Sequence, residues 1–234
     1  MTPELPAIPG GWTNRNFLLA GRTLTITLPA CPDAFLDDPD VLAANRQDDY
    51  MPYWSYLWPA SLETAVAVLN YDWQPGTQAL EIGAGIALTG LAALVRGLSV
   101  TFSDYDRRAI DLALFNAREN HIEQHAEGLL IDWREPIDRQ FPVIFGCDVI
   151  YERQNHRPIL GLLEKMLAKT GQAWISDPGR NHTDAFLELL VHSPFRARHR
   201  VLVREPYPGR PAGTTNLWIV TWKDSGEPGV LTPG

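Results

Sequence analysis

The stretch ALEIGAGIALTG, residues 79–90, runs from an apolar strand-like segment through a glycine-containing turn into a helical pattern. Gly83 and Gly85 allow the backbone of this turn to approach a ligand closely. The helix that follows brings free N–H groups and its positive end to the same place. In an open α/β sheet this place is the crevice at the carboxyl edge, where such proteins bind their ligands. The stretch therefore predicts a small-molecule site directly after a buried strand.

The rest of the chain alternates between short apolar runs and segments of helix length. Continuous apolar runs separated by helices are typical of a parallel sheet that is covered on both faces. Two β-rich runs near the end, residues 195–207 and 213–223, have no helix between them, so we expect them to pair antiparallel. The predicted fold is α/β, a Rossmann-like doubly wound sheet of seven strands with an antiparallel C-terminal hairpin. The parallel strands are expected at residues 78–82, 99–103, 128–131, 143–147 and 173–176, and the helices from residue 59 onward and at 87–97, 106–121, 156–169 and 183–193.

Residues 1–50 are predicted to form a small N-terminal β appendage, followed by a main domain at 51–223 and a disordered tail at 224–234. Within the appendage, alternating apolar residues after a Gly-containing turn indicate a hairpin over residues 16–29. The acidic, proline-containing stretch that completes the appendage is expected to be a loop. No segment has the length and apolarity of a membrane helix, and the N-terminus lacks the pattern of a signal peptide.

The composition fits one globular domain, because 45% of the 234 residues are apolar and such a chain can bury a sizeable core. The net charge of −8 and the absence of Lys/Arg runs argue against a nucleic-acid partner, since that affinity depends on cationic neutralisation of phosphates. Cys31 and Cys147 lie far apart and lack metal-ligand spacing, which favours a reducing compartment without a zinc site. We expect a soluble, cytoplasmic protein with a protein or small-molecule substrate and no membrane partner.

The ligand predicted for the turn is a nucleoside, because Asp104 ends the next strand, where a carboxylate can accept both hydrogen bonds of a ribose diol. A dinucleotide turn requires a third glycine three residues after Gly85, but this chain has Leu88 there. Glu81 suits an ammonium or hydroxyl group better than a pyrophosphate. S-adenosylmethionine meets these conditions, since it has no phosphates and its positive charges favour carboxylates and aromatic faces. The aromatic side chains available for this are Tyr56, Trp58 and Trp133.

Five segments of the chain, taken in order, resemble the motifs of class I, seven-stranded S-adenosylmethionine-dependent methyltransferases. Within that class the chain resembles the lysine-directed protein methyltransferases, which carry an Asp-x-x-Tyr motif after the fourth strand. The resemblance covers residues 53–222 and implies S-adenosylmethionine as cofactor and a protein lysine as acceptor. The segments are WP (58–59), LEIGAG (80–85), SDYD (103–106), IDW (131–133) and GCDVIYE (146–152).

The resemblance also implies which residues line the cofactor site, with Asp132 and Trp133 near the adenine. One position departs from the family, which usually has a third glycine where this chain has Ala87 and therefore an added methyl group. The stretches PYWSYLWP, DPGR and GTTNLW look particularly like the enzymes that methylate the β-subunit of electron transfer flavoprotein. The implied cofactor-site residues are Trp58, Gly83, Asp104, Asp132, Trp133 and Cys147.

Asp148 and Tyr151 of the Asp-x-x-Tyr motif are the predicted catalytic pair. Methyl transfer from a sulfonium is an in-line displacement, so the enzyme mainly orients a neutral nucleophile and excludes water, and no metal is required. Both residues leave the carboxyl edge of the sheet, where they can hold a lysine amine in line. Arg180 follows the fifth strand on a Pro-Gly turn and is predicted to bind an acidic part of the substrate. The simpler interpretation of that stretch is a turn between strand and helix with Asn181 or Thr183 as the helix cap.

Other acceptors and a non-catalytic role are also considered. Methyltransferases for adenine or glutamine typically carry an Asn/Asp-Pro-Pro-Tyr run where this chain has Cys-Asp-Val-Ile-Tyr, so a planar amide is disfavoured. A small-molecule N-methyltransferase of the nicotinamide type would need an aromatic lid, for which Trp12, Tyr53 and Trp54 are available. The third alternative is a non-catalytic, cofactor-binding partner of another enzyme.

Overall fold

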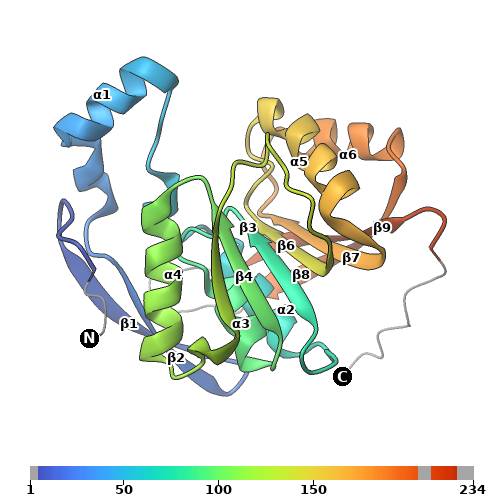
Figure 1. Cartoon of the computed structure of the whole chain (residues 1–234), viewed down its shortest axis with the longest axis horizontal. Coiled ribbons are helices and arrows are strands. Elements are labelled where there is room, and N and C mark those ends of the chain that lie inside the picture. The colour runs from blue at the N-terminus through green and yellow to red at the C-terminus, as the bar shows by residue number, and fades with distance from the viewer. Residues whose placement is uncertain (1–4, 205–211, 226–234) are drawn as a thin grey trace.

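The computed structural model describes residues 5–204 and 212–225, and its centre is a seven-stranded sheet (Figure 1). The strands are β3 (Gln78–Ile82), β4 (Ser99–Asp104), β5 (Ala126–Leu130), β6 (Phe141–Cys147), β7 (Leu167–Asp177), β8 (Phe195–Arg204) and β9 (Gly213–Trp222). Their order in the sheet is β5-β4-β3-β6-β7-β9-β8. The first five run parallel, whereas β9 is antiparallel to both of its neighbours. The predicted parallel sheet with a closing hairpin is therefore confirmed.

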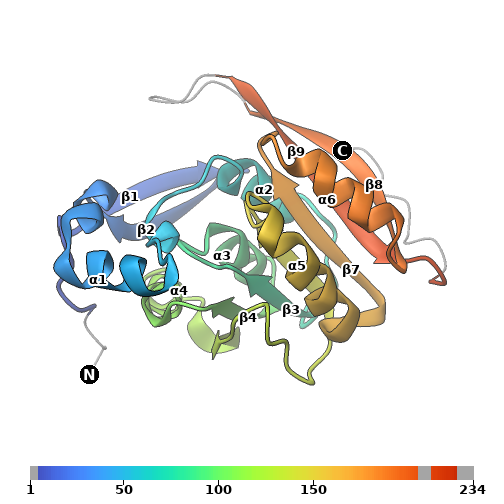
Figure 2. The same ribbon diagram turned by 90° about the horizontal axis from the view of Figure 1, so that it is seen from above.

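Helices cover both faces of this sheet, as expected for a doubly wound fold (Figure 2). They are α2 (Ser61–Leu69), α3 (Leu88–Val95), α4 (Arg107–Glu119), α5 (Arg153–Met166) and α6 (Thr183–Val191). Successive side chains of a strand point to opposite faces. In β3, Ala79 accordingly belongs to a hydrophobic core with α2, α3 and α4, whereas Leu80 belongs to a second core with α5 and α6. The sheet is thus held between two apolar layers.

The N-terminal hairpin forms a separate two-stranded sheet of β1 (Trp12–Leu19) and β2 (Arg22–Pro29), as predicted. Two asparagine side chains of α4 bind the free edge of β2. The Asn116 amide donates to the backbone oxygen of Thr27 (2.9 Å) and accepts from the N–H of the same residue (2.8 Å). Asn120, the C-cap residue of α4, donates to the backbone oxygen of Thr25 (2.7 Å) and accepts from the N–H of Thr25 (2.9 Å). The two amides take the place of a neighbouring strand and attach the appendage to the main domain.

The acidic segment after the hairpin is helical, so the loop expected there is wrong. It contains a 3-10 helix (Pro32–Asp37) and α1 (Pro39–Asp48). Asp38 caps α1, because its carboxylate accepts from the N–H groups of Asp40 (3.0 Å) and Val41 (3.1 Å), and a proline occupies the first helical position. This Asp-Pro pair is the sequence signal for the helix. α1 projects beside the carboxyl edge of the sheet (Figure 1).

The helix expected at residues 156–169 is α5 (Arg153–Met166), which begins and ends earlier than expected. β7 follows it at once. Leu167 pairs with Phe141 of β6, whereas the next paired residue of β7 is Gln172. An irregularity in the ladder therefore accommodates the residues between them. The apolar period of the helix continues through Leu167, so the sequence alone extends the helix into the strand.

The boundary drawn at residue 50 is not marked by a separate core. Phe17 of the hairpin belongs to the same hydrophobic core as Leu112 of α4. The greater part of the tail predicted at residues 224–234 lies outside the described residues. In the described part of the chain, no helix is long and apolar enough to cross a membrane.

Candidate active site

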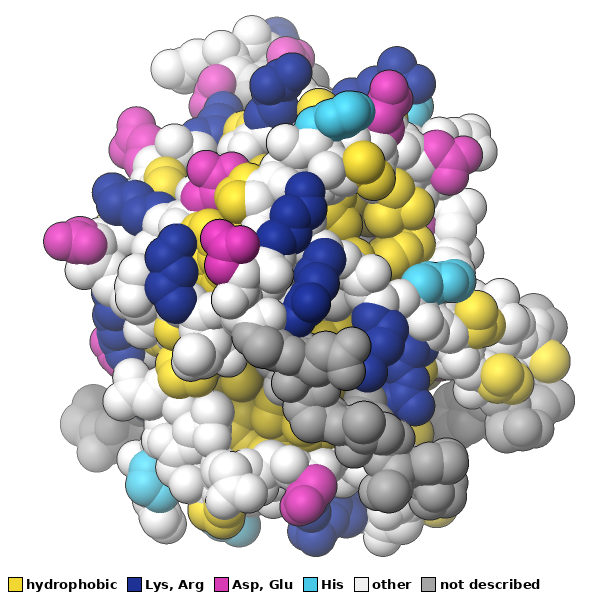
Figure 3. Space-filling view, turned by 90° about the vertical axis from the view of Figure 1, so that its right-hand side faces the viewer, with side chains coloured by type: hydrophobic (Ala, Val, Ile, Leu, Met, Phe, Trp, Pro, Cys, Tyr) yellow, Lys and Arg dark blue, Asp and Glu magenta, His cyan; other side chains and the backbone are white. Residues whose placement is uncertain are grey.

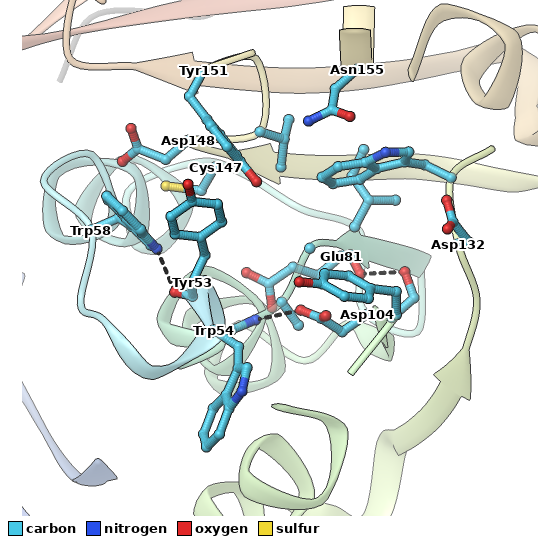
Figure 4. A pocket seen from close by; sticks show the side chains of 18 of the residues that line it. Tyr53, Trp54, Trp58, Glu81, Asp104, Asp132, Cys147, Asp148, Tyr151 and Asn155 are labelled. Atoms are coloured by element: carbon cyan, nitrogen blue, oxygen red, sulfur yellow. Dashed lines mark hydrogen bonds between the residues drawn. The ribbon is translucent and has the colours of Figure 1, made fainter. Parts of the chain in front are cut away.

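A cavity of about 350 Å³ opens at the carboxyl edge of the sheet. Its walls come from the ends of β3, β4 and β6, from the loop after β5, and from the segment that follows α1. A pocket of this size can hold a ligand as large as a nucleoside. Polar and aromatic side chains from these segments converge on it (Figure 4). The sequence-predicted residues that line it are Trp58, Glu81, Gly83, Gly85, Asp104, Asp132, Trp133, Cys147, Asp148 and Tyr151.

The turn after β3 has left-handed backbone at three alternate positions. Gly83, Gly85 and Ala87 have φ values of +59°, +52° and +63°. A Cβ atom on Gly83 would be crowded, at 3.1 Å from Val149 and 3.2 Å from the ring of Trp133. Left-handed backbone costs a residue with a side chain roughly 1–2 kcal/mol, so glycine would be favoured at the third position as well. In this chain Ala87 adopts that backbone and is the N-cap residue of α3.

Asp104 ends β4 and is hydrogen-bonded to the turn. One of its carboxylate oxygens accepts from the N–H of Gly85 (3.1 Å) and the other from the N–H of Asp106 (3.0 Å). Burial raises the pKa of Asp104 to about 6, although both N–H groups oppose the shift. Each oxygen retains a second lone pair, so the carboxylate can still accept the two bonds of a ribose diol. Asp104 thus joins the turn to the end of β4 and keeps lone pairs available for the predicted ribose ligand.

Glu81 is buried beneath the turn and faces α3. Its Oε2 atom has no hydrogen-bond partner among the described residues. The helix leaves room for this carboxylate because residue 90 is glycine, where a Cβ would overlap both Oε2 and the Phe102 ring. Burial raises the pKa of Glu81 to about 8, which the N–H of Gly90 moderates and the charge of Asp104 increases. A buried carboxylate with one unpartnered oxygen at the cavity wall suits a cationic amine. Gly90 does not line the cavity but makes room for this carboxylate, a role that sequence reasoning missed.

Asp132 and Trp133 form the wall that follows β5. The Trp133 ring packs against Gly83, and Asp132 accepts from the Nη2 (2.5 Å) and Nε (2.8 Å) atoms of Arg134. Burial acts to raise the pKa of Asp132, but the hydrogen bonds and charge of Arg134 outweigh it and hold that pKa below its ordinary value. Asp132 is therefore an anion at neutral pH. In Figure 4 it lies on the opposite side of the cavity from Trp58.

Three aromatic rings, the aromatic cluster of Tyr53, Trp58 and Tyr151, pack together at the other side. Tyr53 meets Trp58 and Tyr151 near edge-on, with ring centres 5.8 and 5.3 Å away, and the other two rings are nearly parallel at 6.4 Å. The indole N–H of Trp58 donates to the backbone oxygen of Tyr53 (2.8 Å). Burial and the charge of Asp148 raise the pKa of the neighbouring Cys147 thiol to about 12, so Cys147 forms a neutral wall. Aromatic faces attract cations, so this side of the cavity favours an amine.

Asp148 and Arg180, predicted as a catalytic and a substrate-binding residue, bind each other. Arg180 donates from Nη2 (3.1 Å) and Nε (3.2 Å) to one carboxylate oxygen of Asp148, and the other oxygen accepts from the N–H of Ala60 (3.0 Å). The Asp148 side chain is fully buried, and its backbone is left-handed with a φ of +56°. The guanidinium also lies over the Trp58 ring, 5.1 Å from its centre. Both charged groups are thus engaged with the chain itself.

Asp177, the last residue of β7, holds the turn that carries Arg180. One carboxylate oxygen of Asp177 accepts from the N–H groups of Gly179 and Arg180, both at 2.7 Å, and from the Thr183 hydroxyl at 2.8 Å. The structure thus has the turn between a strand and a helix, but the cap expected at Asn181 or Thr183 is wrong, because the N-cap residue of α6 is His182 and its side chain makes no capping bond.

The cavity wall is strongly acidic. In the described part of the chain it has seven carboxylates and one cation, Arg134, which is paired with Asp132. Such a wall repels phosphates and attracts positively charged ligands. The seven residues are Asp48, Asp49, Glu81, Asp104, Asp132, Asp148 and Glu152.

The aromatic lid considered for a small-molecule acceptor is only partly at the cavity. Tyr53 and Trp54 line it. Trp12 instead packs against Trp54 with ring centres 6.4 Å apart, and its indole N–H donates to the backbone oxygen of Pro6 (2.9 Å). Among the residues that the structure describes, no group of His, Cys, Asp and Glu side chains is arranged to hold a metal ion.

Comparison with known proteins identifies the family. A family model described as lysine methyltransferase matches residues 55–192. The chain belongs to this lysine methyltransferase family. It is 30% identical over 213 residues to the histone-arginine methyltransferase METTL23 of Rattus norvegicus, a match that covers 80% of this chain and 92% of the relative. It is 28% identical over 123 residues to the protein N-lysine methyltransferase METTL21A of Mus musculus, which covers 49% of this chain and 56% of the relative.

Solved methyltransferases share the fold of this lysine methyltransferase family member. The N-methyltransferase NodS of Bradyrhizobium japonicum, solved with S-adenosyl-L-homocysteine, matches with a TM-score of 0.57 and 16% identity over 80% of this chain and 100% of NodS. The chain is a class I protein methyltransferase that uses S-adenosylmethionine, so the non-catalytic alternative is not retained. The glycine turn and the buried Glu81 carboxylate, whose Oε2 atom has no hydrogen-bond partner among the described residues, fit that cofactor. The particular similarity to the enzymes of electron transfer flavoprotein stays a prediction.

Proposed function

We propose that this methyltransferase modifies the amine of a lysine side chain on a protein. The observation that carries the proposal is the aromatic cluster, which stands at one side of an acidic cavity. A lysine side chain has a slender aliphatic stem and a compact cationic head, and both can pack against aromatic rings. Asp48 and Asp49, at the end of α1, line the same cavity and attract a lysine-bearing surface.

The other side of the cavity receives the cofactor in this proposal. Asp104 would accept hydrogen bonds from the ribose hydroxyls, Trp133 would lie beside the adenine, and Glu81 would face the amine of the cofactor. S-adenosylmethionine, when bound, supplies a methyl group on a sulfonium, and the new N–C bond forms as the S–C bond breaks. The acceptor amine must lie in line with that bond, so its orientation by the chain decides the rate.

Tyr151 is the residue proposed to contact the acceptor amine, and its hydroxyl points into the cavity (Figure 4). Burial and the charge of Glu152 raise the pKa of this hydroxyl, so it stays protonated at neutral pH and can accept a hydrogen bond from the amine. The amine must lose a proton before it attacks, and the solvent at the open mouth can take it. Asp148 and Arg180 are proposed as positioning residues, because they hold Trp58 and the start of α2.

An arginine acceptor is the alternative that METTL23 suggests, since its name describes a histone-arginine methyltransferase. A planar guanidinium is held best by carboxylates that accept two in-plane hydrogen bonds. At the aromatic side of the cavity, the Asp148 carboxylate is fully buried and its charge is already paired with Arg180, and Glu152 accepts from Gln154 (2.8 Å). These contacts favour lysine over arginine.

A protein acceptor is favoured over the other partners considered. A free amine of the nicotinamide type is disfavoured because Trp12, one of the three lid candidates, packs behind Trp54. The net charge of −8 and the acidic cavity oppose nucleic acid. A cytoplasmic location stays a prediction from the two separated cysteines.

Incubation of the purified protein with methyl-labelled S-adenosylmethionine and a lysate of its source tests the acceptor class. We expect label on protein bands, and little label with Asp104→Ala, because losing hydrogen bonds to a charged group costs about 1.5–3 kcal/mol of cofactor binding. Asp111→Ala is the matched control, since it removes an exposed carboxylate of α4 and should retain activity. Label confined to the small-molecule fraction would contradict the proposal and favour a free amine.

A further inference from the structure

β8 forms an open edge of the seven-stranded sheet and is long for an edge strand. Its ten residues pair with β9 on one side, and no strand among the described residues covers the other side. The five side chains from residue 197 to residue 201 are all exposed, so the middle of the strand is accessible on both faces. The free N–H and C=O groups of such an edge are a template for another strand.

Arginines occupy one face of β8. Side chains two residues apart point to the same side of a strand, which groups Arg196, Arg198, Arg200 and Arg204. Arg204 pairs with the buried Glu63 at 3.6 Å, whereas Arg198 and Arg200 are exposed and form no ion pair with any described residue. Lys and Arg side chains gather across this side of the molecule (Figure 3). Two of the arginines are therefore free to bind carboxylates.

The opposite face of β8 is apolar toward its carboxyl end. The side chains of Val201 and Val203 are 53% and 70% exposed. His199, on the same face, stacks on Trp218 with ring centres 5.4 Å apart. An edge that is basic on one face and apolar on the other matches a strand whose residues alternate between acidic and apolar.

Simpler explanations account for part of this surface. Charged side chains on an edge strand prevent unwanted pairing, but two exposed valines do not serve that purpose. A second copy of the chain would bring arginines against arginines, which like charges oppose. A phosphate backbone offers neither strand-like N–H and C=O groups nor an apolar partner for the valines, and the whole chain carries a charge of −8.

We infer that the β8 edge binds an extended acidic segment of a partner protein by strand addition. The carboxylates of that segment would face Arg198 and Arg200, and its apolar residues would lie beside Val201 and Val203. β8 runs in the direction of β7, because both are antiparallel to β9, so its carboxyl end reaches the sheet edge that carries the cavity. Three strand spacings separate β8 from β6, or about 15 Å. Such binding goes beyond methyl transfer and does not require it.

Fluorescence anisotropy with a fluorescein-labelled peptide of five Glu-Val repeats measures this binding on the intact protein. We expect Arg198→Glu/Arg200→Glu to weaken binding about tenfold or more, since attractive charge contacts become repulsive. The matched control Arg15→Glu/Arg22→Glu makes the same charge change at exposed positions of the hairpin and should bind like the parent protein. Circular dichroism verifies that both variants fold.

Several results would overturn the inference. Absence of peptide binding, or unchanged affinity in Arg198→Glu/Arg200→Glu, would mean that β8 is not the binding edge. Equal affinity for a peptide of five Glu-Pro repeats, which lacks the proline N–H groups, would exclude strand addition. A single-stranded oligonucleotide that binds through the same two arginines, where the peptide does not, would identify a nucleic-acid surface instead.

Discussion

The guanidinium of Arg180 connects the Asp148 carboxylate to the indole of Trp58, at 3.1 Å from Oδ1 and 5.1 Å from the ring centre. The second Asp148 oxygen accepts a hydrogen bond from the N–H of Ala60, the residue directly before α2. These contacts join the loop before α2, the end of β6 and the turn after β7. The aromatic cluster therefore contacts an ion pair whose carboxylate is fully buried, and we expect its position to depend on that pair.

Replacing Arg180 by methionine should lower the free energy of unfolding by about 3 kcal/mol, because the buried Asp148 charge loses its partner. Trp58 would lose the Arg180 guanidinium that lies over its ring, so turnover should fall while the affinity for S-adenosylhomocysteine changes little. Urea unfolding and titration calorimetry measure these quantities. The double variant Asp148→Asn/Arg180→Met should be more stable than Arg180→Met, because no charge stays buried and asparagine also tolerates left-handed backbone.

The control for this ion pair is Arg134→Met. Arg134 and Asp132 form a more exposed pair at the cavity rim, so its loss should change the free energy of unfolding by less than about 1 kcal/mol. If Arg180→Met costs no more than Arg134→Met, the Asp148–Arg180 pair does not anchor the loop.

The affinity for the cofactor should rise with pH between about 6.5 and 8. Without ligand the pKa of Glu81 is about 8, so this carboxyl group is mostly protonated at neutral pH. A cationic amine placed beside it stabilises the carboxylate and lowers that pKa, so binding releases a proton and tightens as the pH increases. Calorimetry with S-adenosylhomocysteine in two buffers of different ionisation enthalpy measures the release, which should approach one proton near pH 7.

Glu81→Gln serves as the control for this linkage, because glutamine keeps the shape of the side chain but cannot ionise. It should bind the cofactor more weakly and release no proton. The range above pH 6.5 separates Glu81 from Asp104, whose pKa is about 6. An affinity that does not change with pH in the parent protein would remove Glu81 from the amine site.

Gly90→Ala should lower the free energy of unfolding by about 2 kcal/mol, because the added methyl group overlaps the Glu81 carboxylate and the Phe102 ring. Helix propensity alone predicts the opposite sign. Gly161→Ala in α5 is the matched control, since a Cβ there has nothing within 4 Å, and it should stabilise the protein by about 0.5–1 kcal/mol. Thermal unfolding of both variants decides between the two effects.

Asn116→Ala should cost about 2–4 kcal/mol of unfolding free energy, because the buried N–H and C=O groups of Thr27 lose their partners. Asn14→Ala removes a bond to the hydroxyl of the same threonine and should cost less than about 1 kcal/mol. Hydrogen exchange at the Thr27 amide should accelerate in the first variant. Unchanged protection there would mean that packing alone holds the hairpin.

Much of the sheet could be predicted because apolar runs and helix-length segments alternate regularly along the chain. The strands expected at residues 99–103 and 143–147 differ from β4 and β6 by no more than two residues at either end. α1 was not predicted because its sequence has no apolar period, with Val41 as its buried residue. The start of β7 was not predicted because the apolar pattern of the preceding helix continues into it. The pairing of β7 with β6 is also irregular there.

The site could be predicted where its residues belong to one local motif. Gly83, Gly85 and Asp104 come from strand ends that meet at one edge, so their convergence follows from the topology. The bond between Asp148 and Arg180 joins residues 32 positions apart, and no local pattern indicates that two charged side chains will neutralise each other. Contacts between motifs, rather than the motifs themselves, therefore distinguish positioning residues from those that contact the substrate.

The amino acid that carries the transferred methyl group tests the proposed function most directly. Proteins labelled by this enzyme are hydrolysed in acid, and the labelled amino acids are separated against methyl-lysine, methylarginine and methylhistidine standards. We expect label in methyl-lysine, together with loss of labelling in Tyr151→Ala at unchanged affinity for S-adenosylhomocysteine. Label in methylarginine or methylhistidine would contradict it.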